Sequence, residues 1–66
     1  MEVLESTTYF NRYGTRKKRV KIQGEHTQQE LEERLIHDAP FGFWMKFDCV
    51  DEENKIYVGD VHEYWD

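Results

Sequence analysis

Apolar side chains occupy every second position along residues 41–50, "FGFWMKFDCV". A period of two is typical of a β-strand whose two faces meet different surroundings. We therefore predict a strand whose apolar row faces a core and whose other row is open. The apolar row is Phe41, Phe43, Met45, Phe47 and Cys49, and the other row is Gly42, Trp44, Lys46, Asp48 and Val50.

A polar loop, "DEEN" at 51–54, separates this strand from a second one at 55–61, "KIYVGDV". Two strand patterns joined by a short polar loop predict an antiparallel hairpin. In the second strand Ile56 and Val58 share one face and Tyr57 lies on the other, so we expect Ile56 and Val58 in the core. The last five residues, "HEYWD", either extend this strand or fold back as a tail.

One helix is predicted at 28–38. "TQQE", from Thr27 to Glu30, has the spacing of a capping box, in which the threonine hydroxyl accepts from a backbone N–H three residues on. Leu31, Leu35 and Ile36 then fall on one stripe of the helix surface. Pro40 ends the element, because the residue before a proline avoids helical geometry.

Before the helix, residues 6–10 and 15–23 predict a first hairpin around a turn at 11–14. In the second of these strands Val20 and Ile22 share a face with Arg16 and Lys18. The other face carries Lys17, Arg19 and Lys21. Five basic side chains in one strand suit the edge of a sheet, where charges discourage unwanted pairing.

These elements predict an α+β fold of β-β-α-β-β order in a single domain spanning 1–66: a small antiparallel sheet with one helix packed on one face. The open face would carry Trp44, Lys46, Tyr57 and some of the bases. The predicted core is Leu31, Leu35, Ile36, Val20, Ile22, Phe43, Met45, Phe47, Ile56 and Val58.

Composition narrows the functional classes. The chain has 66 residues, a formal net charge of -5 and a single cysteine, Cys49, which we expect to be an inert apolar side chain. An intramolecular disulfide is excluded, and no signal peptide or membrane span is visible, so a reducing cytoplasm is expected. The scattered His26, His37 and His62 form no metal-site or catalytic spacing. We expect no metal, no cofactor and no enzyme.

The net charge hides an asymmetry along the chain. Residues 1–24 carry six basic side chains and two acidic ones, whereas residues 25–66 carry three basic and twelve acidic ones. Carboxylates spread over a small rigid scaffold can imitate a row of phosphates and occupy a basic cleft. Either ordinary solubilising charge or such a binding surface explains the pattern.

Our leading functional prediction is a non-enzymatic inhibitor or modulator that blocks a basic, DNA-binding partner protein with a DNA-mimic-like acidic surface. Its aromatic anchors would be Tyr57, Tyr64 and Trp65, since aromatic side chains supply much of the binding energy at protein interfaces. A homodimer is also expected, because it would cover the open sheet face. The acidic surface would be formed by Glu30, Glu32, Glu33, Asp51, Glu52, Glu53, Asp60 and Glu63.

The alternative prediction is a small nucleic-acid-binding module in which the basic strand contacts phosphates and Trp44 stacks on a base. "FGFWM" at 41–45 resembles the ribonucleoprotein strand of RNA-recognition motifs, with Phe41 and Phe43 in the ring-stacking places. It departs from that pattern at Pro40 and Lys46, and its alternation assigns both rings to the core. The basic residues of this alternative are Arg16, Lys17, Lys18, Arg19 and Lys21.

In size, compactness and charge the chain resembles the small non-catalytic proteins with which bacteriophages disable host factors. This resemblance is one of overall character and assigns no residues. It implies a protein partner that handles DNA, and a location in the cytoplasm of the host cell.

Overall fold

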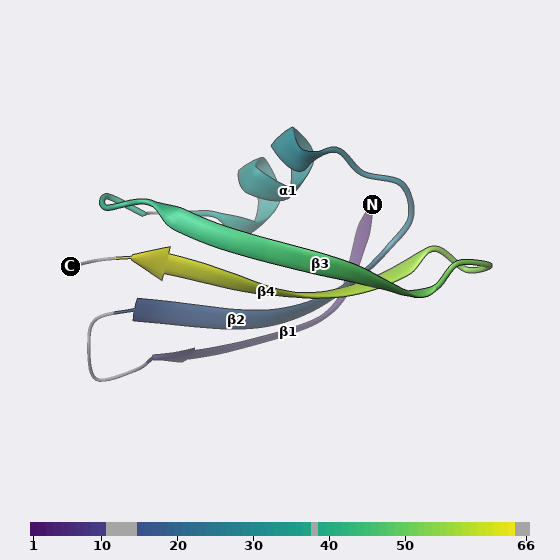
Figure 1. Ribbon diagram of the computed structural model, residues 1–66, viewed down its shortest axis with the longest axis horizontal. Helices are drawn as coiled ribbons and strands as arrows, with labels where there is room; N and C mark the ends of the chain where they lie inside the picture. Colours follow the sequence, from purple (N-terminus) through teal and green to yellow (C-terminus); the bar gives the residue numbers. More distant parts are fainter. Residues whose placement is uncertain (11–14, 38, 65–66) are drawn as a thin grey trace.

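The computed structural model describes residues 1–10, 15–37 and 39–64; the predicted turn at 11–14 and the predicted helical position Asp38 lie outside them. The described chain forms β1 (Glu2–Phe10), β2 (Thr15–Gln23), α1 (Gln28–Leu35), β3 (Phe43–Asp51) and β4 (Ile56–Tyr64) (Figure 1). This order confirms the predicted β-β-α-β-β fold. His62, Glu63 and Tyr64 extend the last strand.

The strands form one antiparallel sheet in the order β1-β2-β4-β3, with α1 on one side of it (Figure 1). Both predicted hairpins are confirmed. The edge position predicted for the basic strand is wrong, because β2 lies between β1 and β4. The neighbouring β4 supplies carboxylates that pair with the cations of β2, namely Glu63 with Arg16 and Lys18, and Asp60 with Arg19.

Helix α1 begins as predicted. The Thr27 hydroxyl accepts a hydrogen bond of 3.1 Å from the Glu30 N–H, which is the N-terminal cap that the sequence indicates. The helix ends at Leu35 rather than at 38, and Ile36 already has extended backbone angles. Groups of the sheet bind the backbone at this end: Lys18 donates to the Leu35 carbonyl, and Glu63 accepts from the His37 N–H.

The core is small and lies between α1 and the middle of the sheet. Among the described residues the buried apolar side chains come from β2, β4 and α1, and partly buried ones pack around them. The five buried residues are Val20, Ile22, Leu31, Leu35 and Val61, and the partly buried ones are Met1, Ile36, Met45, Phe47 and Tyr57.

The facing of β4 is the reverse of the prediction. Tyr57 pairs with Ile22 and Val61 with Lys18, so Tyr57 faces the helix, whereas Ile56 and Val58 face away from it. The inward row of β4 also contains Gly59 and Glu63, which do not look like core residues in a sequence. Gly59 is required there because a Cβ at this position would lie 2.4 Å from Cδ1 of Phe47.

The apolar row of residues 41–50 is only partly covered. Met45 and Phe47 pack against the core, but Phe41, Phe43 and Cys49 are exposed, so the prediction that they are core residues is wrong. The reason is length: an eight-residue helix covers roughly 12 Å, whereas a nine-residue strand spans roughly 30 Å. The ends of β3 therefore extend beyond the helix.

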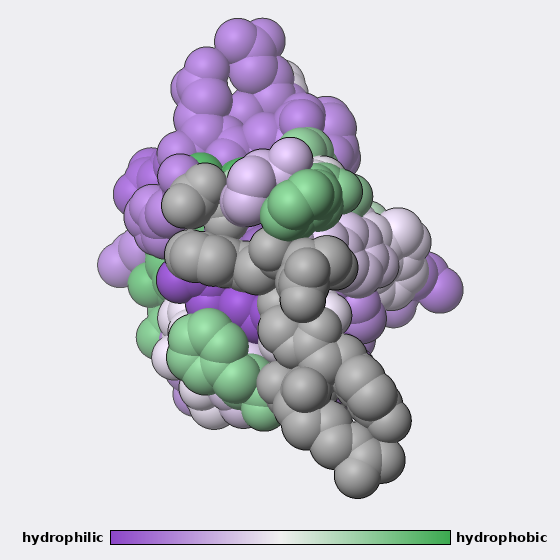
Figure 2. All heavy atoms as spheres, turned by 90° about the vertical axis from the view of Figure 1, so that its left-hand side faces the viewer, coloured by the Kyte–Doolittle hydropathy of each residue, from purple (hydrophilic) through white to green (hydrophobic). Residues whose placement is uncertain are grey.

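One end of the sheet exposes apolar side chains. At this end, on the left of Figure 1, β1 and β4 end and β2 and β3 begin. Figure 2 faces this end and shows hydrophobic side chains at the surface. Phe10 is 70% exposed and Phe41 67%, with Phe43 and Tyr64 less so. The Phe41 N–H donates to the Tyr64 carbonyl, and the Tyr64 N–H to the Gly42 carbonyl, which holds this end together.

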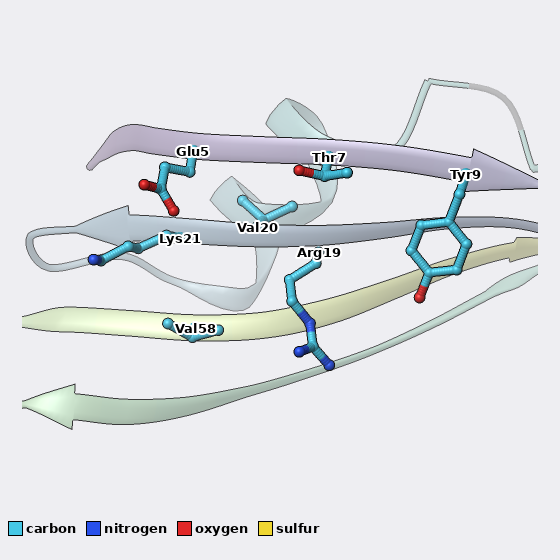
Figure 3. A pocket seen from close by; sticks show the side chains of 7 residues that line it. All are labelled: Glu5, Thr7, Tyr9, Arg19, Val20, Lys21 and Val58. Carbon is cyan, nitrogen blue, oxygen red and sulfur yellow. The ribbon is translucent and has the colours of Figure 1, made fainter.

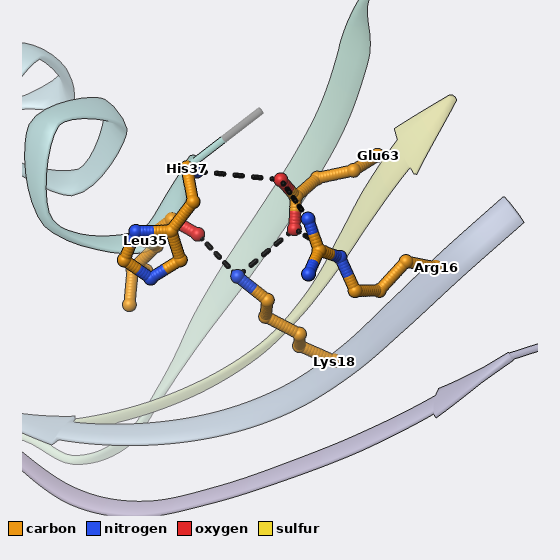
Figure 4. A network of polar contacts seen from close by, with 5 residues as sticks. All are labelled: Arg16, Lys18, Leu35, His37 and Glu63. Carbon is orange, nitrogen blue, oxygen red and sulfur yellow. Dashed lines mark hydrogen bonds and ion pairs between the residues drawn. The ribbon is translucent and has the colours of Figure 1, made fainter. Parts of the chain in front are cut away.

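A buried ionic network joins the sheet to the end of the helix (Figure 4). The Glu63 carboxylate is fully buried and lies 2.9 Å from Nζ of Lys18 and 3.2 Å from Nε of Arg16. Its other oxygen accepts from the His37 N–H at 3.3 Å, and Lys18 also donates to the Leu35 carbonyl at 2.5 Å. Three elements are thus tied together through one carboxylate.

Replacing Glu63 with glutamine should destabilise the fold severely. The change leaves Lys18 and Arg16 without their buried counter-charge, and removing one partner of a buried ion pair costs about 3–5 kcal/mol. Urea unfolding followed by circular dichroism measures the loss. Glu53→Gln, on the exposed β3–β4 turn, is the matched control and should change stability by less than about 0.5 kcal/mol. Equal effects of the two changes would contradict this role for Glu63.

Gly59→Ala should also lower the free energy of unfolding, by about 1–3 kcal/mol, because the added methyl overpacks the site. Its Cβ would meet the Phe47 ring and, at 2.5 Å, the Lys46 carbonyl oxygen. In a Phe47→Leu background the penalty should shrink, since part of the clash is with the ring. An identical penalty in both backgrounds, measured by urea unfolding, would show that the ring is not the obstacle.

Candidate functional site

The sheet face opposite α1, here called the open face, carries side chains in rows across the four strands. The rows follow from the register of the three strand pairs, which places one residue of each strand opposite its neighbours. The first row is Tyr9, Lys17, His62 and Trp44; the second is Thr7, Arg19, Asp60 and Lys46; the third is Glu5, Lys21, Val58 and Asp48.

The first row is bounded by two aromatic rings. Tyr9 on β1 is 48% exposed and Trp44 on β3 is 46% exposed. Trp44 packs on His62, with ring centroids 4.8 Å apart and planes tilted by 52°. The neighbouring imidazole supports the indole from one side, while much of its surface stays in contact with solvent. Both rings are therefore available to stack on a flat ligand.

The second row is centred on an exposed ion pair. Nε of Arg19 lies 3.1 Å from Oδ1 of Asp60, and Nη2 donates to Oδ2 at 3.4 Å. The hydrogen bond and the charge of Asp60 raise the pKa of Arg19 above its ordinary value. Lys46 is exposed at the β3 end of the same row, and Lys17 of the first row is half-buried. The first two rows together hold three permanent cations and one carboxylate.

Two shallow hollows lie on the open face. One, of about 600 Å³, is lined on β1 and β2 by Tyr9, Thr7 and Lys21 among others, and Figure 3 shows Tyr9 at one end of it and Lys21 at the other. The second, of about 430 Å³, lies toward β3 against Trp44 and Lys46. Arg19 and Val58 line both hollows, so the two hollows lie next to each other on the open face.

The structure divides the predicted basic site between the two sides of the sheet. Lys17, Arg19, Lys21 and Trp44 lie together on the open face, as the alternation indicates. Arg16 and Lys18 point to the helix side and bind Glu63, so they do not belong to this surface.

Among the aromatic and basic residues of the face, Tyr9, His62 and Lys46 were not predicted site residues. The pattern of alternating residues already places Lys46 beside Trp44. Tyr9 and His62 depend on the register between strands that are far apart in sequence.

The predicted acidic surface is not assembled in one place. Glu63 is buried beneath the helix end, which contradicts its assignment to a surface, because it neutralises two inward-facing cations. Asp60 lies on the open face with Arg19. Glu30 lies 3.7 Å from the Met1 amino group.

The remaining predicted acids lie in two groups. Glu32 and Glu33 lie on the helix, and Asp51, Glu52 and Glu53 lie at the β3–β4 turn at the far end of the sheet (Figure 1). Within the turn, hydrogen bonds from the side chain and backbone of Asn54 lower the pKa of Asp51.

The predicted aromatic anchors are also separated. Tyr57 packs against the core and meets the His26 ring edge-on at 4.7 Å, so it is not a surface anchor. Tyr64 is 37% exposed at the apolar end of the sheet. Trp65 lies outside the described residues.

Neither a metal centre nor a membrane-crossing helix is found in the described chain. Across residues 1–10, 15–37 and 39–64, no group of three or more His, Cys, Asp or Glu side chains is placed to hold a metal ion. No helix in the part of the chain that the structure describes is long and apolar enough to cross a membrane.

Comparisons with protein-family models, with curated proteins and with solved structures found no match for this chain. The candidate site therefore depends on the geometry of the open face alone.

Proposed function

We propose that the protein is a non-catalytic binding module whose open face binds single-stranded nucleic acid. The observation that carries the proposal is the pair of adjacent rows in which Tyr9 and Trp44 bound the first row. Lys17 lies between these rings, and Arg19 and Lys46 lie in the second row. Base stacking on aromatic rings beside a cationic track is the arrangement that binds single strands without reading their sequence.

The dimensions of the face suit a short single strand. Neighbouring strands lie about 4.8 Å apart, so the three spacings from β1 to β3 cover about 14 Å. In RNA-recognition motifs, exposed aromatic rings on a four-stranded sheet stack two or three bases. Tyr9 and Trp44 are at the two sides of the face, which gives each ring a separate base and leaves the cations of the two rows for the backbone.

The charge of the whole protein limits the strength of this binding. The chain carries a net charge of -5, and the acidic helix and the β3–β4 turn lie outside the open face. Charges separated by more than about 8 Å are largely screened at physiological salt. Binding should therefore be strongest at low salt and short-ranged.

Binding of a fluorescent oligothymidine, followed by anisotropy at low and physiological salt, tests the proposal. With three phosphate contacts the slope of log K against log salt should be roughly -2. Trp44→Ala should weaken binding about tenfold, as expected for one lost base stack. Lys17→Ala should weaken binding and reduce the slope. Lys55→Ala is the matched control, because it removes a lysine that pairs with Glu25 away from the face.

Two outcomes would refute the proposal. One is the absence of binding at low salt. The other is an equal loss for Lys17→Ala and Lys55→Ala, which would indicate a response to net charge and not to the open face.

A second candidate is the protein-binding modulator with a DNA-mimic-like acidic surface. It is supported by the surface position of Glu32 and Glu33 on the helix and of Glu52 and Glu53 on the turn, together with the negative net charge. Its partner would be a basic, DNA-binding protein. Under both candidates the protein acts in a reducing cytoplasm, and its likeness to bacteriophage host-takeover proteins stays a prediction.

Capture of basic DNA-binding proteins from a cell lysate should follow from the second candidate. Changing Glu30, Glu32 and Glu33 to Gln should abolish this capture, because it removes the acidic face of the helix. The control variant Glu2→Gln, Glu5→Gln, Asp48→Asn removes the same charge from the sheet. Recovery of only neutral or acidic proteins, or the same loss in both variants, would argue against mimicry by the helix.

A further inference from the structure

Strand β1 has an unusual environment for a strand of its length. All nine of its residues are exposed, and none of them belongs to the buried core. One edge of β1 pairs with β2, and the other edge is the outer edge of the sheet. A long strand with an uncovered edge and two uncovered faces offers a template for pairing with another strand.

The two ends of β1 are held differently. An irregularity in the register between Val3 and Glu5 separates them. On the N-terminal side Met1 packs against the core, its amino group lies near Glu30, and its carbonyl accepts from Arg34. On the other side residues 6–10 continue in regular pairing with β2.

The regular half of β1 has the composition of a pairing edge. Residues 6–10, "STTYF", contain no charge, no proline and no glycine, and they are rich in strand-forming residues. The opposite edge strand, β3, carries Lys46 and Asp48 in its middle. Charges are the usual protection of an exposed edge, so β3 is protected and residues 6–10 are not.

We propose that β1 pairs antiparallel with β1 of a second copy of this chain, about a two-fold axis through Thr7. In this register Thr7 faces the partner's Thr7, and Ser6 faces the partner's Thr8. Glu5 faces the partner's Tyr9. No like charges stand opposite each other, and the Thr and Ser pairs suit a strand interface.

A second copy fits this edge because the interface is self-complementary, as a two-fold contact requires. The exposed Phe10 of each copy approaches the partner's Leu4, which is itself 39% exposed. An axis perpendicular to the sheet keeps both helices on the same side and joins the two open faces into one. The pairing uses the strand edge, not the open face, and does not rest on the proposed function.

Substitutions at the axis test this arrangement. Thr7→Lys places two lysines opposite each other in the dimer, and Thr7→Glu places two glutamates there. Sedimentation equilibrium over micromolar to submillimolar concentrations should show the wild type approaching twice the 8.1 kDa of one chain. Each variant alone should dissociate at least several-fold more readily, and an equimolar mixture of the two should recover the dimer.

The mixture distinguishes the proposal from a general loss of folding, because unfolded variants would not restore a dimer to each other. Circular dichroism checks that each variant is folded. Thr7→Glu places its carboxylate opposite the positively charged Arg19 of β2, which is compatible with folding. Lys46→Glu on the opposite edge is the control and should leave the dimer unchanged. A wild type that stays monomeric throughout, or a folded Thr7→Glu variant that dimerises as well as the wild type, overturns the proposal.

Discussion

The buried carboxylate of Glu63 is the constraint on which the arrangement of this protein depends. It neutralises Lys18 and Arg16 beneath the helix and also accepts from the His37 N–H. It thereby stabilises the facing in which Lys18 points inward. A slip of one residue in β2 would turn Val20 outward and bring uncompensated lysines into the core. The network therefore sorts the cations of the basic strand between the two sides of the sheet.

The same sorting also caps the short helix. Lys18 donates to the carbonyl of Leu35, the last helical residue, whose carbonyl has no partner inside the helix. A short helix covers only the middle of the sheet, and the rings of Phe41 and Phe43 remain at the surface. What looked in the sequence like one continuous core row is a small core with an apolar end. That apolar end and the outer edge of β1 both remain exposed in the single chain.

Local patterns predicted the elements well, whereas their facing and order required long-range contacts. The cap at Thr27 and both hairpins are readable because they depend on residues a few positions apart. The facing of β4 is not, because Gly59 and Glu63 occupy its inward row for reasons set by Phe47 and Lys18. The candidate site divides in the same way. Alternation alone groups Lys17, Arg19 and Lys21, but only the register between strands brings Tyr9 and His62 into the same row.

The Arg19–Asp60 pair determines how the open face can meet an anionic ligand. Because the guanidinium already has a carboxylate partner, a phosphate gains its contact only by competing with Asp60. An exposed ion pair of this kind contributes little to stability. A ligand that also stacks on a ring can therefore displace Asp60 from Arg19 at a small cost in free energy. Lys17 and Lys46 lie on either side of this pair. Under the proposed function the face would therefore favour a ligand that offers both an aromatic plane and a negative charge over one that offers charge alone.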